Sequence, residues 1–172
     1  MVNKYKDKDK QKEATDWFIG RARSAGGYRR QIFENNPNRE RVNTVQGKMY
    51  FFAYDPKYKD VLPVWDKFPL VFPIDPKPGG FLGLNLHYLS TDERLALLGS
   101  MIKYANNTKM DRTTRLNIDY DLISNVRKLS GLSRPCIKRY LFSHVRSPFI
   151  EILPKEWEKV VALPLELFIT KA

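Results

Sequence analysis

Apolar and polar residues alternate from position 81 to position 88, in the run FLGLNLHY, with the strictest two-residue period of the chain. Because successive side chains of a β-strand point to opposite faces, this pattern predicts a strand. Two earlier runs also predict strands. GKMYFFAYD (47–55) carries aromatic side chains on both faces, and FPLVFPI (68–74) is an apolar run with prolines near its ends.

Prolines and glycines limit how these strands can pair. Pro69 and Pro73 lack the N–H group that a sheet ladder needs, so we expect them at a strand start, an edge or a bulge. Gly79 and Gly80 predict the reversal between the second and third strands. The run FIEIL (149–153) alternates in the same way, and because its backbone needs partners we expect it to close the same barrel.

Helical periodicity dominates after Ser90. Ser90 and Glu93 have the spacing of a capping box at the start of a helix over 90–107. Further helices are predicted over 119–131, 133–145 and 154–163. The predicted fold class is therefore α+β: a small, SH3-like, curved antiparallel β-sheet or barrel with an N-terminal helix and a mostly helical C-terminal half.

The N-terminal part is polar and basic. Lysine and aspartate alternate through the first dozen residues, which predicts a flexible or partner-ordered arm. A short amphipathic helix is expected from about Glu13 to the Gly26–Gly27 pair, followed by a connecting loop. The expected organisation is a basic arm with its helix over 1–46, and a single α+β domain over 47–172 that is β-rich at 47–89, helical at 90–146, and a strand with a short helix at 147–172.

Composition and charge narrow the classes of partner. The 172 residues include 42% hydrophobic and 13% aromatic residues, enough for one buried core. Thirty Lys and Arg against 19 acidic residues give a net charge of +11, which favours nucleic acid, an anionic protein surface or a membrane face as partner, although a merely solvated basic surface fits equally well. Because no secretory signal or membrane-spanning run is visible, we expect a protein made in the cytoplasm, without a membrane partner.

The chain offers little catalytic or metal-binding chemistry. Cys136 is the single cysteine, so an internal disulfide is excluded, and a zinc cluster is not expected with only His87 and His144 beside it. A lone histidine between apolar strand neighbours is more often structural than a catalytic base. The glycines of KPGGFLG lead into a strand and lack the Lys-Ser/Thr of a phosphate loop. We therefore expect no enzyme activity, catalytic residue, cofactor or metal.

Clustered basic residues are the better candidates for contacts with a partner. Arginines could pair with carboxylates at a protein interface, or with phosphates beside aromatic residues that stack on bases. The aromatic Trp17 and Phe18 are more readily explained as the buried stripe of their helix. The candidate contact residues are Arg21, Arg23, Arg29, Arg30, Arg39, Arg41, Arg134, Lys138, Arg139 and Arg146.

The sequence of several segments resembles a conserved family of small proteins from large, contractile-tailed bacteriophages of the T-even-like group. The resemblance is carried by GKMYFFAYDPK, LPVWDKFPLVFPI and GGFLGLNLHYL, and later by CIKRYLFSHVRSPFIEI and EWEKVVALPLELF, roughly residues 47–168, after a DWF helix. It implies a phage gene product that is part of the particle or needed to build it. It brings no catalytic residues.

Two functional hypotheses follow. The first is a structural or assembly component of the virion, at the baseplate, tail or head-tail region, which acts as an adaptor between other phage structural proteins. The alternative is a phage nucleic-acid-binding protein that places the same basic residues on phosphates. In either case the expected location is the virion, after synthesis in the host cytoplasm.

Overall fold

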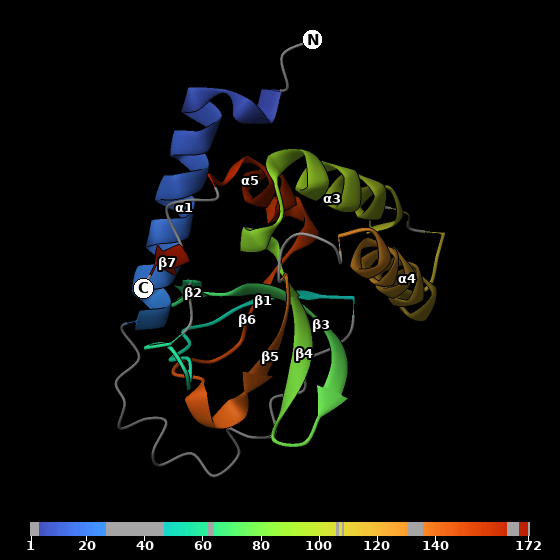
Figure 1. Ribbon diagram of the computed structural model, residues 1–172. Coiled ribbons are helices and arrows are strands. Elements are labelled where there is room, and N and C mark those ends of the chain that lie inside the picture. Colours follow the sequence, from blue (N-terminus) through green and yellow to red (C-terminus); the bar gives the residue numbers. More distant parts are fainter. Residues whose placement is uncertain are drawn as a thin grey trace.

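A five-stranded antiparallel sheet forms the centre of the protein (Figure 1). The computed structural model describes residues 4–26, 47–61, 64–105, 107, 109–130, 136–164 and 169–171. The strand order is β5 (Ile137–Leu141), β4 (Gly80–Asn85), β3 (Leu70–Lys77), β1 (Met49–Phe51), β6 (Ile150–Ile152). The expected α+β class is confirmed. The sheet is not closed into a barrel, because β5 and β6 are both edges.

A second, two-stranded sheet lies beside the first. Strand β2 (Val64–Asp66) pairs antiparallel with β7 (Ile169–Lys171), and Trp65 lies opposite Thr170. The sequence runs that predict strands do not include β2, and pairing with the far end of the chain makes this segment a strand.

The turn-forming residues take the predicted positions. Pro69 precedes β3, and Pro73 lies where the pairing of β3 with β4 shifts register, so neither interrupts a regular ladder. Gly79 makes the reversal between these strands with a φ of +69°, a conformation that favours glycine. At Gly83 a Cβ atom would lie 2.2 Å from Val71 Cγ1, so the missing side chain lets the valine on the neighbouring strand approach closely.

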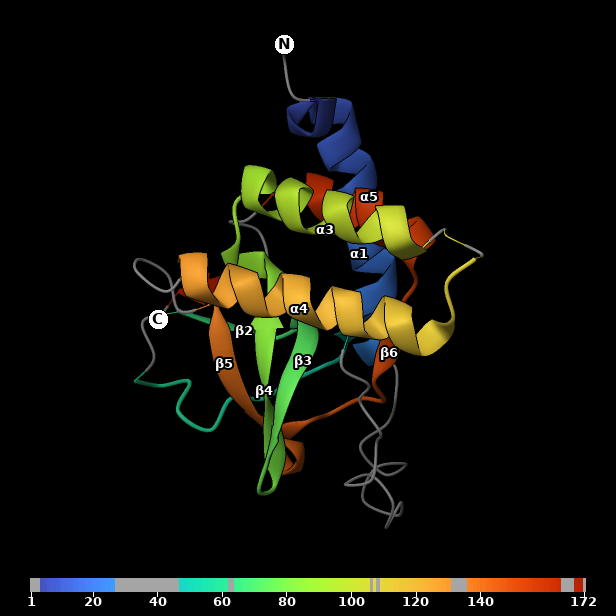
Figure 2. The same ribbon diagram turned by 90° about the vertical axis from the view of Figure 1, so that its right-hand side faces the viewer.

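Four helices gather on one side of the sheet (Figures 1 and 2). They are α1 (Lys8–Gly26), α3 (Thr91–Ala105), α4 (Arg112–Ser130) and α5 (Trp157–Ala162). Each contributes buried side chains to the main core, among them Phe18, Leu98, Ile123 and Trp157. Ser90 and Glu93 form the predicted capping box at the start of α3, with both reciprocal hydrogen bonds present. No helix among the described residues is long and apolar enough to span a bilayer.

Two sequence predictions fail locally. Residues 137–141 form strand β5 and not part of a helix over 133–145, because they pair with β4, Phe81 opposite Tyr140. The predicted helical stretch to residue 146 is therefore interrupted by a strand. The second failure is the flexible arm, since α1 begins at Lys8, where Asp7 accepts hydrogen bonds from the backbone N–H groups of Asp9 and Lys10.

The face of the sheet away from the helices carries an aromatic cluster. Phe52, Tyr54, Val71, Phe81, Tyr140 and Val145 are buried there, with Phe142 and Phe149 packed against them. The rings of Phe52 and Phe149 have centroids 4.7 Å apart, so the segment after β5 folds over this face. A short 3₁₀ helix, η4 (Phe142–His144), begins that segment.

Candidate functional site

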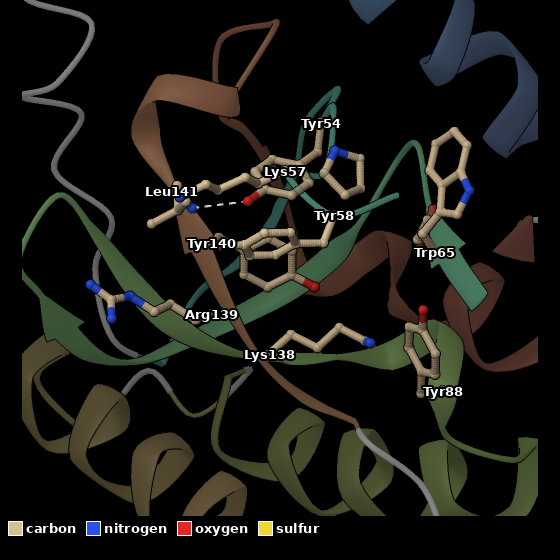
Figure 3. Close-up of a pocket in the computed structure, with 11 residues that line it drawn as sticks. Tyr54, Lys57, Tyr58, Trp65, Tyr88, Lys138, Arg139, Tyr140 and Leu141 are labelled. Carbon is tan, nitrogen blue, oxygen red and sulfur yellow. Dashed lines mark hydrogen bonds between the residues drawn. The ribbon is translucent and has the colours of Figure 1, made fainter. Parts of the chain in front are cut away.

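A cavity of about 520 Å³ opens beside edge strand β5, next to β2 (Figure 3). Aromatic side chains and cationic side chains dominate its lining. The lining residues are Tyr54, Pro56, Lys57, Tyr58, Trp65, Asp66, Tyr88, Lys138, Arg139, Tyr140 and Leu141. Flat apolar rings combined with positive charge suit a ligand that is itself flat and negatively charged.

Tyr54 and Tyr140 form a rigid floor. Their ring centroids lie 5.2 Å apart in an edge-to-face arrangement. The Tyr54 hydroxyl accepts a hydrogen bond of 3.0 Å from the N–H group of Leu141, which is the dashed line of Figure 3. Burial raises the pKa of both phenols, so both hydroxyls stay neutral across the physiological range.

A buried polar network lies behind the floor. The Asp66 carboxylate accepts hydrogen bonds from Phe68 N–H at 2.9 Å, from Asn85 Nδ2 at 3.2 Å and from His87 Nδ1. The Asn85 amide also donates to the Tyr140 hydroxyl at 3.1 Å, and its oxygen accepts from His87 N–H at 2.9 Å. Because three groups donate hydrogen bonds to it, the carboxylate is compensated where it is buried, and the network fixes the turn from β4 into the 3₁₀ helix η3 (Leu86–Tyr88).

Tyr88 and Lys138 form one wall. The Lys138 Nζ atom lies 4.5 Å from the centroid of the Tyr88 ring, a cation–π contact. Burial lowers the pKa of Lys138, and the nearby Asp66 carboxylate acts in the opposite direction. Tyr88 is 4% exposed, and its hydroxyl has no hydrogen-bond partner among the described residues. Figure 3 shows this hydroxyl on the side of Trp65.

The rim presents aromatic rings to solvent. Tyr58 is 60% exposed, and Trp65 is partly exposed on β2. Lys57 Nζ lies 5.2 Å from the centroid of the Tyr58 ring. The turn that follows Pro56 thus places a cation and a free ring face beside the opening. Such a rim can hold a flat ring system and an adjacent anion together.

A comparison with known protein families decides the family. The model of the family described as phage T4 terminal DNA protecting protein matches residues 1–172. The chain belongs to this family. No curated protein and no solved structure matches the chain.

The family match corrects the main functional hypothesis. The resemblance to a T-even-like phage family is confirmed, and the match extends beyond residues 47–168 to the whole chain. The interpretation as a structural adaptor of the baseplate, tail or head-tail region is wrong, because the family is described by the protection of terminal DNA. The match likewise gives no support to phage structural proteins as partners. Nucleic-acid binding, the alternative hypothesis, fits the family better.

The structure separates the predicted contact residues from one another. Lys138 lies in the cavity wall. Its neighbour Arg139 also borders the cavity, but the Arg139 side chain extends in the opposite direction from that of Lys138 (Figure 3) and donates to the Pro78 carbonyl at 2.9 Å. This separation follows from β5 being a strand, since successive side chains point to opposite faces.

The other described candidates lie elsewhere. Arg21 forms an ion pair with Glu156 and thereby links α1 to the 3₁₀ helix η5 (Pro154–Glu156). Arg23 is exposed in the last turn of α1. Arg146 donates to the Ser143 carbonyl at 2.7 Å. The remaining candidates, Arg29, Arg30, Arg39, Arg41 and Arg134, lie outside the described residues.

Sequence reasoning missed most of the cavity. The candidate contact residues did not include Lys57, Tyr58 or Trp65, and Tyr88 was expected at the end of a strand. A signal was present in the run DPKYKDVLPVWDK, where aromatic residues are interleaved with lysines. Asp66 could not be connected to Asn85 and His87 from the sequence, because the contact joins two different sheets.

The histidines and the cysteine have structural surroundings. His87 is buried against Asp66, and His144 Nδ1 donates to the Asp55 carbonyl at 2.8 Å. Cys136, the single cysteine of the chain, is buried. Within the described part of the chain, no group of three or more His, Cys, Asp or Glu side chains is placed to hold a metal ion.

Proposed function

We propose that this protein binds the ends of linear DNA and shields them from nucleases that begin at an end. The observation that carries the proposal is the match of the whole chain, residues 1–172, to the family of the phage T4 terminal DNA protecting protein. The net charge of +11 supports it, because phosphate neutralisation supplies most of the affinity of proteins for DNA.

The cavity geometry supports binding at an end and not along a duplex. A protein that tracks the side of a duplex needs an extended basic surface that follows many phosphates. The described structure has a hollow of about 520 Å³ that combines aromatic rings with the ammonium groups of Lys57 and Lys138. A hollow of this size suits one unit at the end of a chain, because a terminal unit enters it without bending the strand on both sides.

Protection by occupancy needs no bond breaking, so the proposal includes the absence of catalysis. It also includes the expected location: a protein that guards the ends of phage DNA would accompany that DNA in the virion. Mass spectrometry of purified particles tests the location. Copies present in the same low number as DNA ends support it, and absence of the protein from particles contradicts it.

Nuclease protection tests the activity directly. Linear duplex DNA is incubated with the protein and then with an exonuclease that starts at ends, or with an endonuclease that cuts internally. We expect the protein to slow the exonuclease strongly at a protein concentration that leaves the endonuclease unaffected. Equal protection from both enzymes would indicate coating along the duplex and would contradict end binding.

A further inference from the structure

We infer that the cavity beside β5 receives one unpaired nucleotide at the DNA terminus, with the base among the aromatic rings and a phosphate at Lys138. The inference rests on the proposed function and adds which part of the end is held. The protein would therefore bind frayed or overhanging DNA ends and not blunt ends whose last base pair is closed.

The size and lining of the cavity fit a nucleotide. A volume of about 520 Å³ lies within the range of roughly 300–1,000 Å³ typical of pockets for small ligands. A double helix does not enter a hollow of this size, whereas a single base that has left the stack does. The lining is mostly aromatic with few polar groups, as expected where the ligand is a flat ring.

Stacking is available at the rim. Tyr58 is 60% exposed and Trp65 partly exposed, so both rings have faces that no protein group covers completely. The two rings lie beside the same opening, so a flat ligand that enters the cavity would meet both of them. Every base has a π face, so stacking on these rings would be tolerant of sequence, as protection of an end requires.

The buried hydroxyl of Tyr88 provides an independent observation. It is buried just behind the cavity wall on the side of Trp65, and it has no hydrogen-bond partner among the described residues (Figure 3). Buried polar groups are normally hydrogen-bonded. The edge of a nucleobase carries both donors and acceptors, so a base that displaces the side chains over this hydroxyl would supply the partner that it lacks.

The charge distribution favours an anion next to the base. Lys138 is partly buried, and the Asp66 carboxylate that faces it is already occupied by Phe68 N–H, Asn85 and His87. Lys57 contributes a second ammonium group from the rim. A phosphate at Lys138 would gain from the low local polarity, because partly buried charges are screened less than exposed ones.

A fluorescent base analogue tests the inference. 2-Aminopurine loses fluorescence when it stacks, so it is placed either as a one-nucleotide overhang or inside the same duplex, with 5′ and 3′ overhangs prepared separately. On titration with the full chain we expect a large loss of fluorescence for one or both overhang probes and no change for the internal probe. The overhang probe that loses fluorescence, 5′ or 3′, identifies which strand end enters the cavity.

Variants tie the signal to the cavity. Tyr58→Ala and Lys138→Gln should each weaken binding of the responding overhang probe by about tenfold or more, since stacking on one ring contributes about this much. Lys155→Gln, an exposed lysine of η5 outside the cavity, is the matched control and should bind as the unaltered protein does. Because Tyr58 is exposed, its truncation leaves the core intact.

The outcomes distinguish the inference from the proposed function. If the protein protects DNA ends from the exonuclease, but the overhang base keeps its fluorescence and both cavity variants bind normally, the inference is overturned and the proposed function stands. If the unaltered protein shows no preference for linear over closed circular DNA, the proposed function fails and the inference fails with it.

Discussion

The ammonium group of Lys138 lies 4.5 Å from the ring centroid of Tyr88, at the wall of the cavity beside β5. The two residues come from different elements, β5 and η3, and the Tyr88 hydroxyl has no hydrogen-bond partner among the described residues. Their juxtaposition places a cation, a ring and a buried hydroxyl within one site. The first prediction concerns this cation.

Replacing Lys138 by glutamine should reduce DNA-end affinity and its salt dependence together. Loss of one phosphate contact lowers the slope of log affinity against log salt by about 1. Fluorescence anisotropy with an end-labelled duplex over a range of salt concentrations measures both quantities. Lys155→Gln serves as the control. A slope equal to that of the unaltered protein would show that Lys138 makes no phosphate contact.

Asp119 on α4 should make stability depend on pH. Burial raises the pKa of this carboxyl from 3.8 to about 7, while Arg115 opposes the shift. Between these values the folded protein keeps a proton that the unfolded chain has lost, so the stability contribution is complete below about pH 4 and is lost as the pH rises to about 7. Above about pH 7 this carboxyl is ionised in both states, so its contribution to the free energy of unfolding should no longer change with pH.

The variant Asp119→Asn removes this titration. We expect it to flatten the change in free energy of unfolding between about pH 4 and pH 7, and to raise stability at about pH 8 by on the order of 2 kcal/mol. Urea unfolding at several pH values gives the measurement, and Asp121→Asn, an exposed position of the same helix, is the control. An unchanged pH profile in Asp119→Asn would refute the assignment.

Arg94 should be essential for joining α3 to α5. Its buried guanidinium donates hydrogen bonds to the carbonyl of Leu89 at 3.0 Å and to those of Val160 and Leu163 at 2.7 Å each. Arg94→Met keeps the aliphatic stem but leaves these carbonyl groups without a hydrogen-bond donor. We therefore expect the free energy of unfolding to fall by about 3 kcal/mol or more. Thermal or urea unfolding checks this against Arg112→Met, an exposed position on α4, and equal stability of the two variants would contradict it.

A pair of glycine substitutions should have opposite effects. In Gly83→Ala the new Cβ would lie 2.2 Å from Val71 Cγ1, and overpacking of this kind costs about 1–3 kcal/mol. In Gly20→Ala on α1 no atom lies within 4 Å of the new Cβ, and alanine should stabilise the helix by up to about 1 kcal/mol. Unfolding curves of the two variants compare them directly. Tolerance of Gly83→Ala would show that the β3–β4 contact is looser than described.

The parts of the fold that were predictable depend on local signals. The two-residue period predicts β4 (Gly80–Asn85) through Asn85, whereas Leu86–Tyr88 form the 3₁₀ helix η3, and the capping box of Ser90 and Glu93 starts α3 where predicted. The reversal at Gly79 and the bulge beside Pro73 follow from backbone constraints that belong to the residues themselves. Such signals need no knowledge of what the segment packs against.

Strand β5 shows where local signals fail. Ile137, Tyr140 and Leu141 have helical spacing, yet the same five-residue strand also alternates, with Lys138 and Tyr140 on one face. A run this short fits both periods, and pairing with β4 decides between them. The error also affected the site, because a helix would have grouped Lys138 with Arg134, whereas the strand directs the Lys138 and Arg139 side chains in opposite directions.

The cavity itself was beyond sequence reasoning because its residues come from four separate segments. Tyr54, Trp65, Tyr88 and Tyr140 are brought together by strand pairing and by the Asp66–Asn85–His87 network. Composition indicated a basic protein with many aromatic residues, and the family match indicated DNA ends. Only the three-dimensional arrangement connects these two observations at one place.

Competition between linear and circular DNA of the same sequence tests the central claim most directly. A labelled overhang duplex is bound to the protein at fixed salt and displaced with closed circular plasmid, with the plasmid cut once, or with the plasmid cut into many fragments. If the protein binds ends, competition should rise in proportion to the number of ends, and the closed circle should compete poorly. Competition that depends only on the total mass of DNA, whatever the number of ends, would contradict end binding.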